Sequence, residues 1–130
     1  MRKGLENEEA FRDHLSRILN SERLLRDCIS RCRRVEHWEG VLVNHYNDDQ
    51  GRTLLERLTY SKEDAEHGLD PKHNIPIKGN KGYDSIYEGT ASLRNAVKLY
   101  LDFLSKHPPI GSPSDKVRRT LNSLDNGTRL

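Results

Sequence analysis

The spacing of apolar residues between Glu22 and Trp38 constrains the fold of this 130-residue chain more than any other feature of its sequence. Four apolar residues recur there at intervals of three or four: Leu24, Cys28, Cys32 and Val35. At about 100° per residue they share one helical stripe, which Leu25 and Ile29 widen. Such a stripe must be buried against other helices, so the segment predicts an amphipathic helix within a helical assembly.

Residues on the N-terminal side of this segment predict a first helix of the same kind. Asn7 is a good N-cap residue, and two glutamates follow it in the first turn, where carboxylates suit the helix dipole. The inward face is expected at i, i+4, i+7 and i+8, which are Phe11, Leu15, Ile18 and Leu19. Ser21 is then the expected N-cap of the helix from 22 to 38, and Gly40 is its expected end.

The middle of the chain predicts only short elements. Val41-Leu42-Val43 is a β-prone run, too brief to form a sheet unaided. A helix is expected after Asp48-Asp49, and its inward face consists of Leu54, Leu55 and Leu58. Ser61 and the acidic residues after it are typical of the cap and first turn of another short helix, which is expected to end at Gly68.

The C-terminal half combines a long loop with the last main helix. Residues 69–82 are expected to form a loop, because prolines and glycines interrupt any regular pattern at Pro71, Pro76, Gly79 and Gly82. The helix is expected from Ala91 to His107, after Thr90 as its N-cap, and Pro108-Pro109 stops it. Its wide apolar face comprises Leu93, Ala96, Val97, Tyr100, Leu101, Phe103 and Leu104.

These segments together predict an all-α fold, a compact bundle of four to five helices with a long loop before the last main helix. Residues 1–110 are long enough for a single helical domain with one modest core. Residues 111–130 are polar, and we expect them to form a flexible tail with at most one weak helix.

Composition restricts the classes of partner. The net charge is only +2, so no global positive field attracts nucleic acid or anionic lipid, and any such binding requires a local patch. Mean hydropathy is −0.90, and no apolar run approaches the roughly 20 residues that span a bilayer. The N-terminus also lacks the apolar stretch of a signal peptide. We therefore expect no membrane partner, a cytoplasmic location, and reduced thiols at Cys28 and Cys32.

Opposite its apolar stripe, the helix from 22 to 38 carries a basic surface that we call the arginine face. It consists of Arg23, Arg26, Ser30, Arg33, Arg34 and His37. Guanidinium groups at one-turn intervals can follow a phosphate backbone with planar, bidentate contacts. The alternative is a solvated face with ordinary local ion pairs, in which Arg31, Asp27 and Glu36 also take part.

A second basic segment runs from Asn74 to Tyr83, at the end of the loop of residues 69–82, which we call the lysine loop. Glycines allow backbone N–H groups to approach phosphates, and Lys78 and Lys81 add positive charge. The loop lacks the G-x-x-x-x-G-K-[ST] pattern of a nucleotide-binding P-loop, so nucleotide hydrolysis is not implied. It is either a second contact point for a nucleic acid or protein partner, or a flexible connector.

The sequence predicts neither a metal centre nor a catalytic site. Cys28, Cys32, His37 and His45 contain the right atoms for zinc, but the two cysteines lie on an apolar stripe, where small buried thiols are the simpler interpretation. No Ser or Cys has the spacing of a known hydrolase nucleophile. Trp38 could stack on a base, or pack against its neighbours. We expect a protein without a cofactor that is not an enzyme.

Three patterns in the predicted helices carry a family resemblance. They are Phe11-x3-Leu15, then Ser21-x2-Leu24-x3-Cys28-x3-Cys32-x2-Val35, and the closing segment from Ala91 to Leu104. Over residues 7 to 106 this arrangement resembles the helical core-binding (SAM-like) N-terminal domain of phage-integrase-type tyrosine recombinases. The chain departs from that family at Leu24 and Cys28, where the family often has Thr and Tyr.

In that family the helical module clamps one side of the DNA. The catalytic Arg…His-x-x-Arg…Tyr set has no counterpart in this chain, so the resemblance implies the DNA-holding part without the recombinase. Such a module could serve as an accessory of a mobile element or a defence system.

The sequence therefore predicts a non-catalytic nucleic-acid-binding helical module, with DNA as the partner. The residues expected to contact it are Arg23, Arg26, Arg33, Arg34, His37, Lys78 and Lys81. The alternative is a protein-interaction module, an adaptor, inhibitor or oligomerisation domain, whose charged face meets an acidic or DNA-binding protein.

Overall fold

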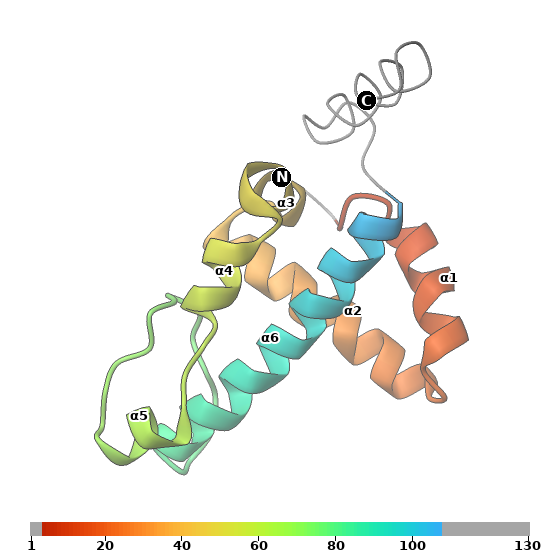
Figure 1. Cartoon of the computed structure of the whole chain (residues 1–130). Coiled ribbons are helices and arrows are strands. Elements are labelled where there is room, and N and C mark those ends of the chain that lie inside the picture. The colour runs from red at the N-terminus through yellow and green to blue at the C-terminus, as the bar shows by residue number, and fades with distance from the viewer. Residues whose placement is uncertain (1–3, 108–130) are drawn as a thin grey trace.

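The computed structural model describes residues 4–107, and within this range the chain forms helices and no strand. In order, they are α1 (Glu8–Ile18), α2 (Glu22–Glu39), α3 (Leu42–Asp49), α4 (Arg52–Arg57), α5 (Lys62–Glu66) and α6 (Tyr83–Lys106). The two longest helices, α2 and α6, cross at the centre of the molecule (Figure 1). The all-α bundle with a long loop before the last main helix is confirmed, and tail residues 111–130 lie outside the described range.

The core forms where α1, α2 and α6 meet. Phe11 of α1 stands edge-on to Tyr100 of α6, with ring centroids 4.9 Å apart and an angle of 83° between the rings. Phe103 completes this aromatic cluster, 5.3 Å from Phe11. The Tyr100 hydroxyl donates a hydrogen bond to the carbonyl oxygen of Glu6 at 2.8 Å, so the segment before α1 is tied to α6.

The N-terminal elements largely follow the prediction. Ser21 caps α2, because its Oγ accepts a hydrogen bond from the Leu24 N–H at 3.3 Å, and Gly40 ends the helix with φ 97°. Asn7 precedes α1 as expected, but it adopts a left-handed conformation and its side chain makes no capping bond. Ile18 and Leu24, both expected to be buried, are 49% and 51% exposed, so these two assignments were wrong.

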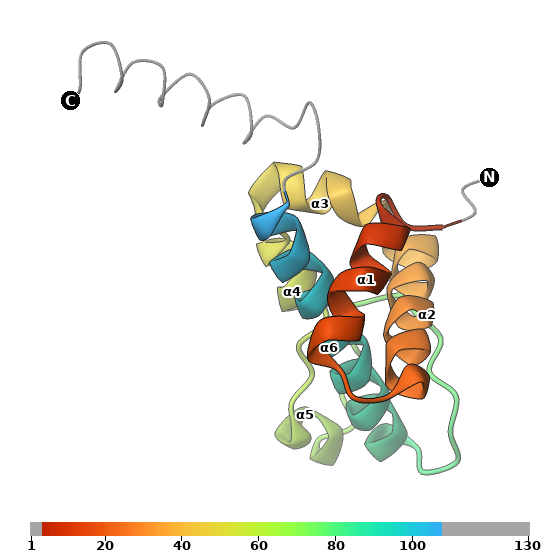
Figure 2. The same ribbon diagram turned by 90° about the vertical axis from the view of Figure 1, so that its right-hand side faces the viewer.

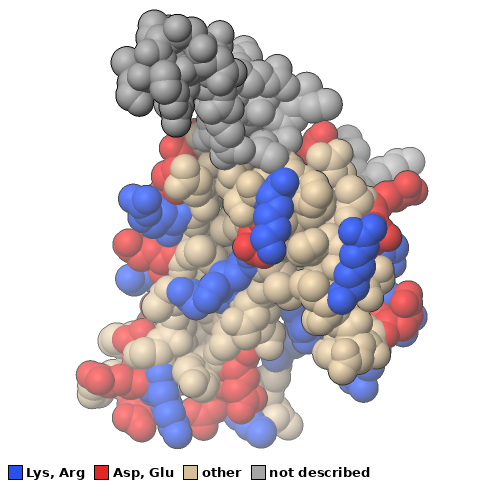
Figure 3. Space-filling view, turned by 45° about the vertical axis from the view of Figure 1, so that its right-hand side comes forward, with Lys and Arg blue, Asp and Glu red and all other residues tan. Residues whose placement is uncertain are grey.

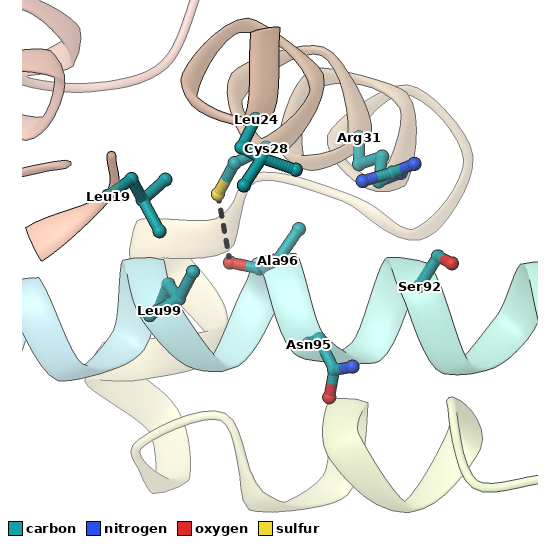
Figure 4. Close-up of a pocket in the computed structure, with 8 residues that line it drawn as sticks. All are labelled: Leu19, Leu24, Cys28, Arg31, Ser92, Asn95, Ala96 and Leu99. Atoms are coloured by element: carbon teal, nitrogen blue, oxygen red, sulfur yellow. Dashed lines mark hydrogen bonds between the residues drawn. The ribbon is translucent and has the colours of Figure 1, made fainter. Parts of the chain in front are cut away.

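The exposure of Leu24 has a geometric cause. The buried residues of α2 are Leu25, Cys28, Ile29, Cys32 and Val35. The buried stripe is therefore turned toward Leu25 and Ile29, the two residues expected only to flank it. Leu24 stands at the other margin of the stripe, where its side chain lines an open pocket beside α6 (Figure 4).

The prediction of a β-prone run at residues 41–43 was wrong, because α3 begins at Leu42. Leu42 and Tyr46 lie one helical turn apart and are 0% and 5% exposed, so burial of this pair outweighs the local preference of the two valines. The Glu36 side chain accepts a hydrogen bond from the Leu42 N–H at 2.9 Å, which satisfies a donor at the start of α3.

The two short helices begin with the predicted side chains. Asp49 accepts hydrogen bonds from the backbone N–H groups of Gly51 and Thr53, at 3.1 and 2.9 Å, at the start of α4. Ser61 and Asp64 form a reciprocal capping box at the start of α5. Helix α5 lies against the N-terminal part of α6.

Helix α6 begins at Tyr83, not at Ala91 as predicted. Thr90 is not a cap but a fully buried residue within the helix, hydrogen-bonded to His73 at 2.8 Å. Gly89 explains why the first turns were missed: a Cβ there would lie 2.7 Å from the Ile77 Cγ2 atom, so a residue that weakens helix propensity is needed for close packing of the loop.

Candidate nucleic-acid interface

The arginine face does not form one uninterrupted solvent-facing stripe, because Arg33 reaches across to α1. Its Nε donates to Glu8 Oε1 at 2.9 Å, and its Nη2 donates to Glu8 Oε2, so the ion pair is bidentate. Burial alone would raise the pKa of Glu8, but the hydrogen bonds from Arg33 and from the Leu5 N–H outweigh burial and lower it. Arg33 therefore holds α1 against α2.

Arg34 reaches the opposite way, to the lysine loop. Its Nη2 donates to the carbonyl oxygen of Pro76. Beside this contact, the Glu39 carboxylate accepts from the Asn74 N–H at 2.9 Å and from Arg57 Nε at 2.6 Å, and the Glu39 side chain is only 3% exposed. The first half of the loop is thereby fixed to α2, and Figure 2 shows the loop running alongside this helix.

A buried histidine fixes the same part of the loop to α6. His73 Nδ1 accepts from the Ile75 N–H at 3.1 Å, which leaves Nε2 as the protonated nitrogen of the neutral ring. Nε2 then donates to Thr90 Oγ1 at 2.8 Å. Burial lowers the pKa of His73, and the neighbouring Arg57 and Arg34 guanidinium groups add to this effect against the opposing charge of Glu39. The ring is thus held neutral.

The second half of the lysine loop carries the two predicted lysines into solvent. Lys78 and Lys81 line an open pocket at the start of α6 together with Gly79, Asn80, Ser85, Glu88, Gly89 and Ser92. The Lys81 N–H donates to Ser85 Oγ at 3.0 Å, which ties the backbone of the loop to the first turn of the helix. Both lysine side chains are therefore exposed, and the backbone at Lys81 has a defined contact with α6.

The N-terminal half of the arginine face remains in solvent. Arg23 is 85% exposed at its side chain and lies 3.9 Å from Asp27, a distance at which an exposed pair contributes little. Arg26 is also exposed. At the other end of the helix, the His37 ring stands edge-on to Trp38 with centroids 5.3 Å apart, and Trp38 is 46% exposed.

One basic residue was not among the predicted contacts. Arg31, interpreted from the sequence only as a member of local ion pairs, lines a groove between α2 and α6 together with Ser92. Ser92 also lines the pocket that holds Lys78 and Lys81, so the groove and the pocket adjoin. The spacing of Arg31 and Arg34, one helical turn apart, was the sequence signal that could have grouped them.

Charge on the surface is otherwise mixed. In the view of Figure 3, Lys and Arg side chains are interspersed with Asp and Glu, and no patch of one sign dominates. This agrees with a net charge of +2 and means that a positive surface, where one exists, is local.

The four residues weighed as zinc ligands do not converge. Cys28 and Cys32 are buried free thiols whose sulfur atoms face the carbonyl oxygen of Ala96 at 3.9 and 3.3 Å. His37 is exposed, and His45 is hydrogen-bonded to the Glu39 carbonyl oxygen at 2.6 Å. Across residues 4–107 no group of three or more His, Cys, Asp or Glu side chains is arranged to hold a metal ion.

Nor does any helix between residues 4 and 107 have both the length and the apolar character that a membrane crossing requires. Comparison with family models, curated proteins and solved structures found no match to this chain. The resemblance to recombinase core-binding domains therefore stays a prediction from the sequence.

Proposed function

We propose that this chain is a non-catalytic nucleic-acid-binding module and that its partner is duplex DNA. The observation that carries the proposal is the hydrogen bond from Arg34 to the Pro76 carbonyl oxygen. It joins the C-terminal part of α2 to the loop that carries Lys78 and Lys81, so that the two basic segments, far apart in the sequence, are in contact.

The proposed interface divides its arginines between two roles. Arg23, Arg26, Lys78 and Lys81 are exposed and are the phosphate contacts. Arg33 and Arg34 have structural roles, because Arg33 holds α1 against α2 and Arg34 holds the lysine loop against α2. His37 and Trp38 extend the surface at the C-terminal end of α2, where an exposed indole can stack on a base or lie against a sugar.

The physical argument concerns local rather than total charge. A duplex carries a dense row of phosphates, and each phosphate neutralised by Lys or Arg releases counterions and contributes about 0.9 to the slope of log K against log salt. Four contacts suffice for salt-sensitive binding by a chain of small net charge. The predicted resemblance to a DNA-clamping domain agrees with this assignment but does not carry it.

A salt-titrated binding assay tests the proposal. The double variant Lys78→Ala with Lys81→Ala should bind a mixed-sequence duplex more weakly and lower the salt slope by about 2. The matched control removes two exposed lysines from the far part of α6, Lys98→Ala with Lys106→Ala, and should leave the slope unchanged. Equal losses in both double variants, or no binding of the unmodified chain at low salt, would contradict the proposal.

The same assay separates the alternative, a protein-interaction module that uses this charged face. For that alternative, neither duplex nor single strands would bind at low salt, and a single-stranded probe in parallel with the duplex also shows which form of nucleic acid is preferred.

A further inference from the structure

An apolar groove lies between α2 and α6 beside the proposed interface. It is lined by Leu19, Leu24, Cys28, Arg31, Ser92, Asn95, Ala96 and Leu99 and encloses about 180 Å³. In Figure 4 its two ends differ: Leu19 and Leu99 lie at one end, and Arg31 and Ser92 at the other. The groove is therefore polarised along its length.

The apolar end leaves large side chains in water. Leu24 is 51% exposed, and Ile18, which precedes Leu19 in the chain without lining the groove, is 49% exposed. Burying such surface is favourable by about 25 cal/mol per Å². Exposed apolar patches with a polar rim mark interaction sites more often than chance arrangements do. Leu24 does not belong to the buried core cluster, so its side chain is available for contact with a partner.

The polar end of the groove favours a ligand with a negatively charged group. Arg31 is the only charged side chain among the described residues that line the groove. It follows Leu24 by seven residues on α2, so the two backbone positions lie about 10 Å apart along the helix axis at 1.5 Å per residue. A complementary ligand has apolar groups and a carboxylate separated by a similar distance.

We propose that this groove binds a short amphipathic helical segment of a partner protein. Two apolar side chains of that segment occupy the end formed by Leu19, Leu24 and Leu99, and an Asp or Glu seven residues after the first of them pairs with Arg31. This is the helix-in-groove mode, in which anchors recur at i, i+4 and i+7. The proposal goes beyond DNA binding, because Leu19, Leu24, Leu99 and Arg31 are not among the proposed phosphate contacts.

A synthetic peptide is the direct probe. We would use a fluorescently labelled, helix-forming peptide of fifteen residues with two leucines and one glutamate spaced at i, i+4 and i+7, and a matched peptide with lysine in place of that glutamate. Anisotropy titrations with the full chain should give measurable binding of the glutamate peptide and at least fivefold weaker binding of the lysine peptide.

Substitutions in the groove then identify the site. Leu24→Asp should weaken binding of the glutamate peptide at least tenfold. Because Leu24 is exposed, the variant should fold normally, and circular dichroism checks this. Arg31→Glu should reverse the preference, so that the lysine peptide binds better. Arg26→Ala is the matched control on the same helix, since Arg26 does not line the groove, and it should leave both peptides unaffected while weakening duplex binding.

Cys28 gives an independent readout, because its side chain lines the groove. The bound glutamate peptide should slow alkylation of Cys28 by N-ethylmaleimide, measured by mass spectrometry and compared with the rate in the presence of the lysine peptide. Equal binding of the two peptides would overturn the proposal. So would displacement of the peptide by the duplex to the same extent in the unmodified chain and in Leu24→Asp. Self-association of the chain through Leu24 would also overturn it, because a second copy would then be the occupant.

Discussion

The two halves of the arginine face each contain two arginines, but only those of the C-terminal half contact other parts of the molecule. Toward the C-terminal end of α2, Arg33 donates hydrogen bonds to Glu8, and Arg34 donates one to the Pro76 carbonyl oxygen. Toward the N-terminal end, Arg23 and Arg26 project into solvent. Spacing along a helix fixes the direction of each side chain, but whether that direction meets a neighbour depends on where α1 and the loop lie.

The largest expected effect is a loss of stability on removal of Glu39, which anchors the lysine loop beside the C-terminal half of the arginine face. Glu39→Ala should lower the free energy of unfolding by about 3 kcal/mol, because Arg57 and the Asn74 N–H lose a shared, nearly buried acceptor. Urea denaturation followed by circular dichroism measures the change. A loss below about 0.5 kcal/mol would mean that the loop does not depend on this carboxylate for its position.

The next largest effect is expected in the salt dependence of DNA binding, which compares the arginines of the two halves directly. Arg23→Ala with Arg26→Ala should lower the salt slope by about 2 while leaving stability nearly unchanged, because both side chains are exposed. Arg33→Ala should change the slope by less, since its guanidinium is already neutralised by Glu8. The comparison fails if the two halves of the face have equal effects on the slope.

A smaller effect is expected in stability for Arg33 itself. Arg33→Ala should cost about 1 kcal/mol, since half of its side chain is exposed and the bidentate pair with Glu8 is partly screened. Arg26→Ala should stay within about 0.5 kcal/mol of the unmodified chain. A double-mutant cycle with Glu8→Ala isolates the coupling, and additive losses would show that the pair contributes nothing to holding α1.

The smallest expected effect is a pH dependence at the loop. Because the pKa of His73 is lowered in the fold, its contribution to stability is complete above the ordinary histidine pKa of about 6.5 and is lost as pH falls below it. Protonation of Nδ1 removes the acceptor of the Ile75 N–H. Denaturation curves between pH 7.5 and about 5 should therefore show a loss that is absent in His73→Gln.

Strong periodicity made the long helices readable from sequence. The cap at Ser21, the stop at Gly40 and most of the buried face of α2 are local properties of one segment. Helix α3 was not readable, because the buried pair Leu42 and Tyr46 is stabilised by contacts with distant elements, whereas the valines beside it locally favour a strand.

The candidate site was predictable only in part, for a related reason. Sequence spacing identified the arginines and the two lysines, but not that Arg34 would join them through a backbone carbonyl 42 residues away. The groove depends on the way α2 crosses α6, so neither the exposure of Leu24 nor the position of Arg31 follows from either helix alone.

The contact between Gly89 and Ile77 makes it possible to separate the placement of charge from its amount. Because an added Cβ at residue 89 would meet Ile77 at 2.7 Å, Gly89→Ala acts as a wedge beneath the loop and displaces the segment that precedes Lys78. No charge is added or removed. A chain altered in this way keeps the electrostatic content of the unmodified protein but has a different shape, so any change in its partner preference reports on geometric fit alone.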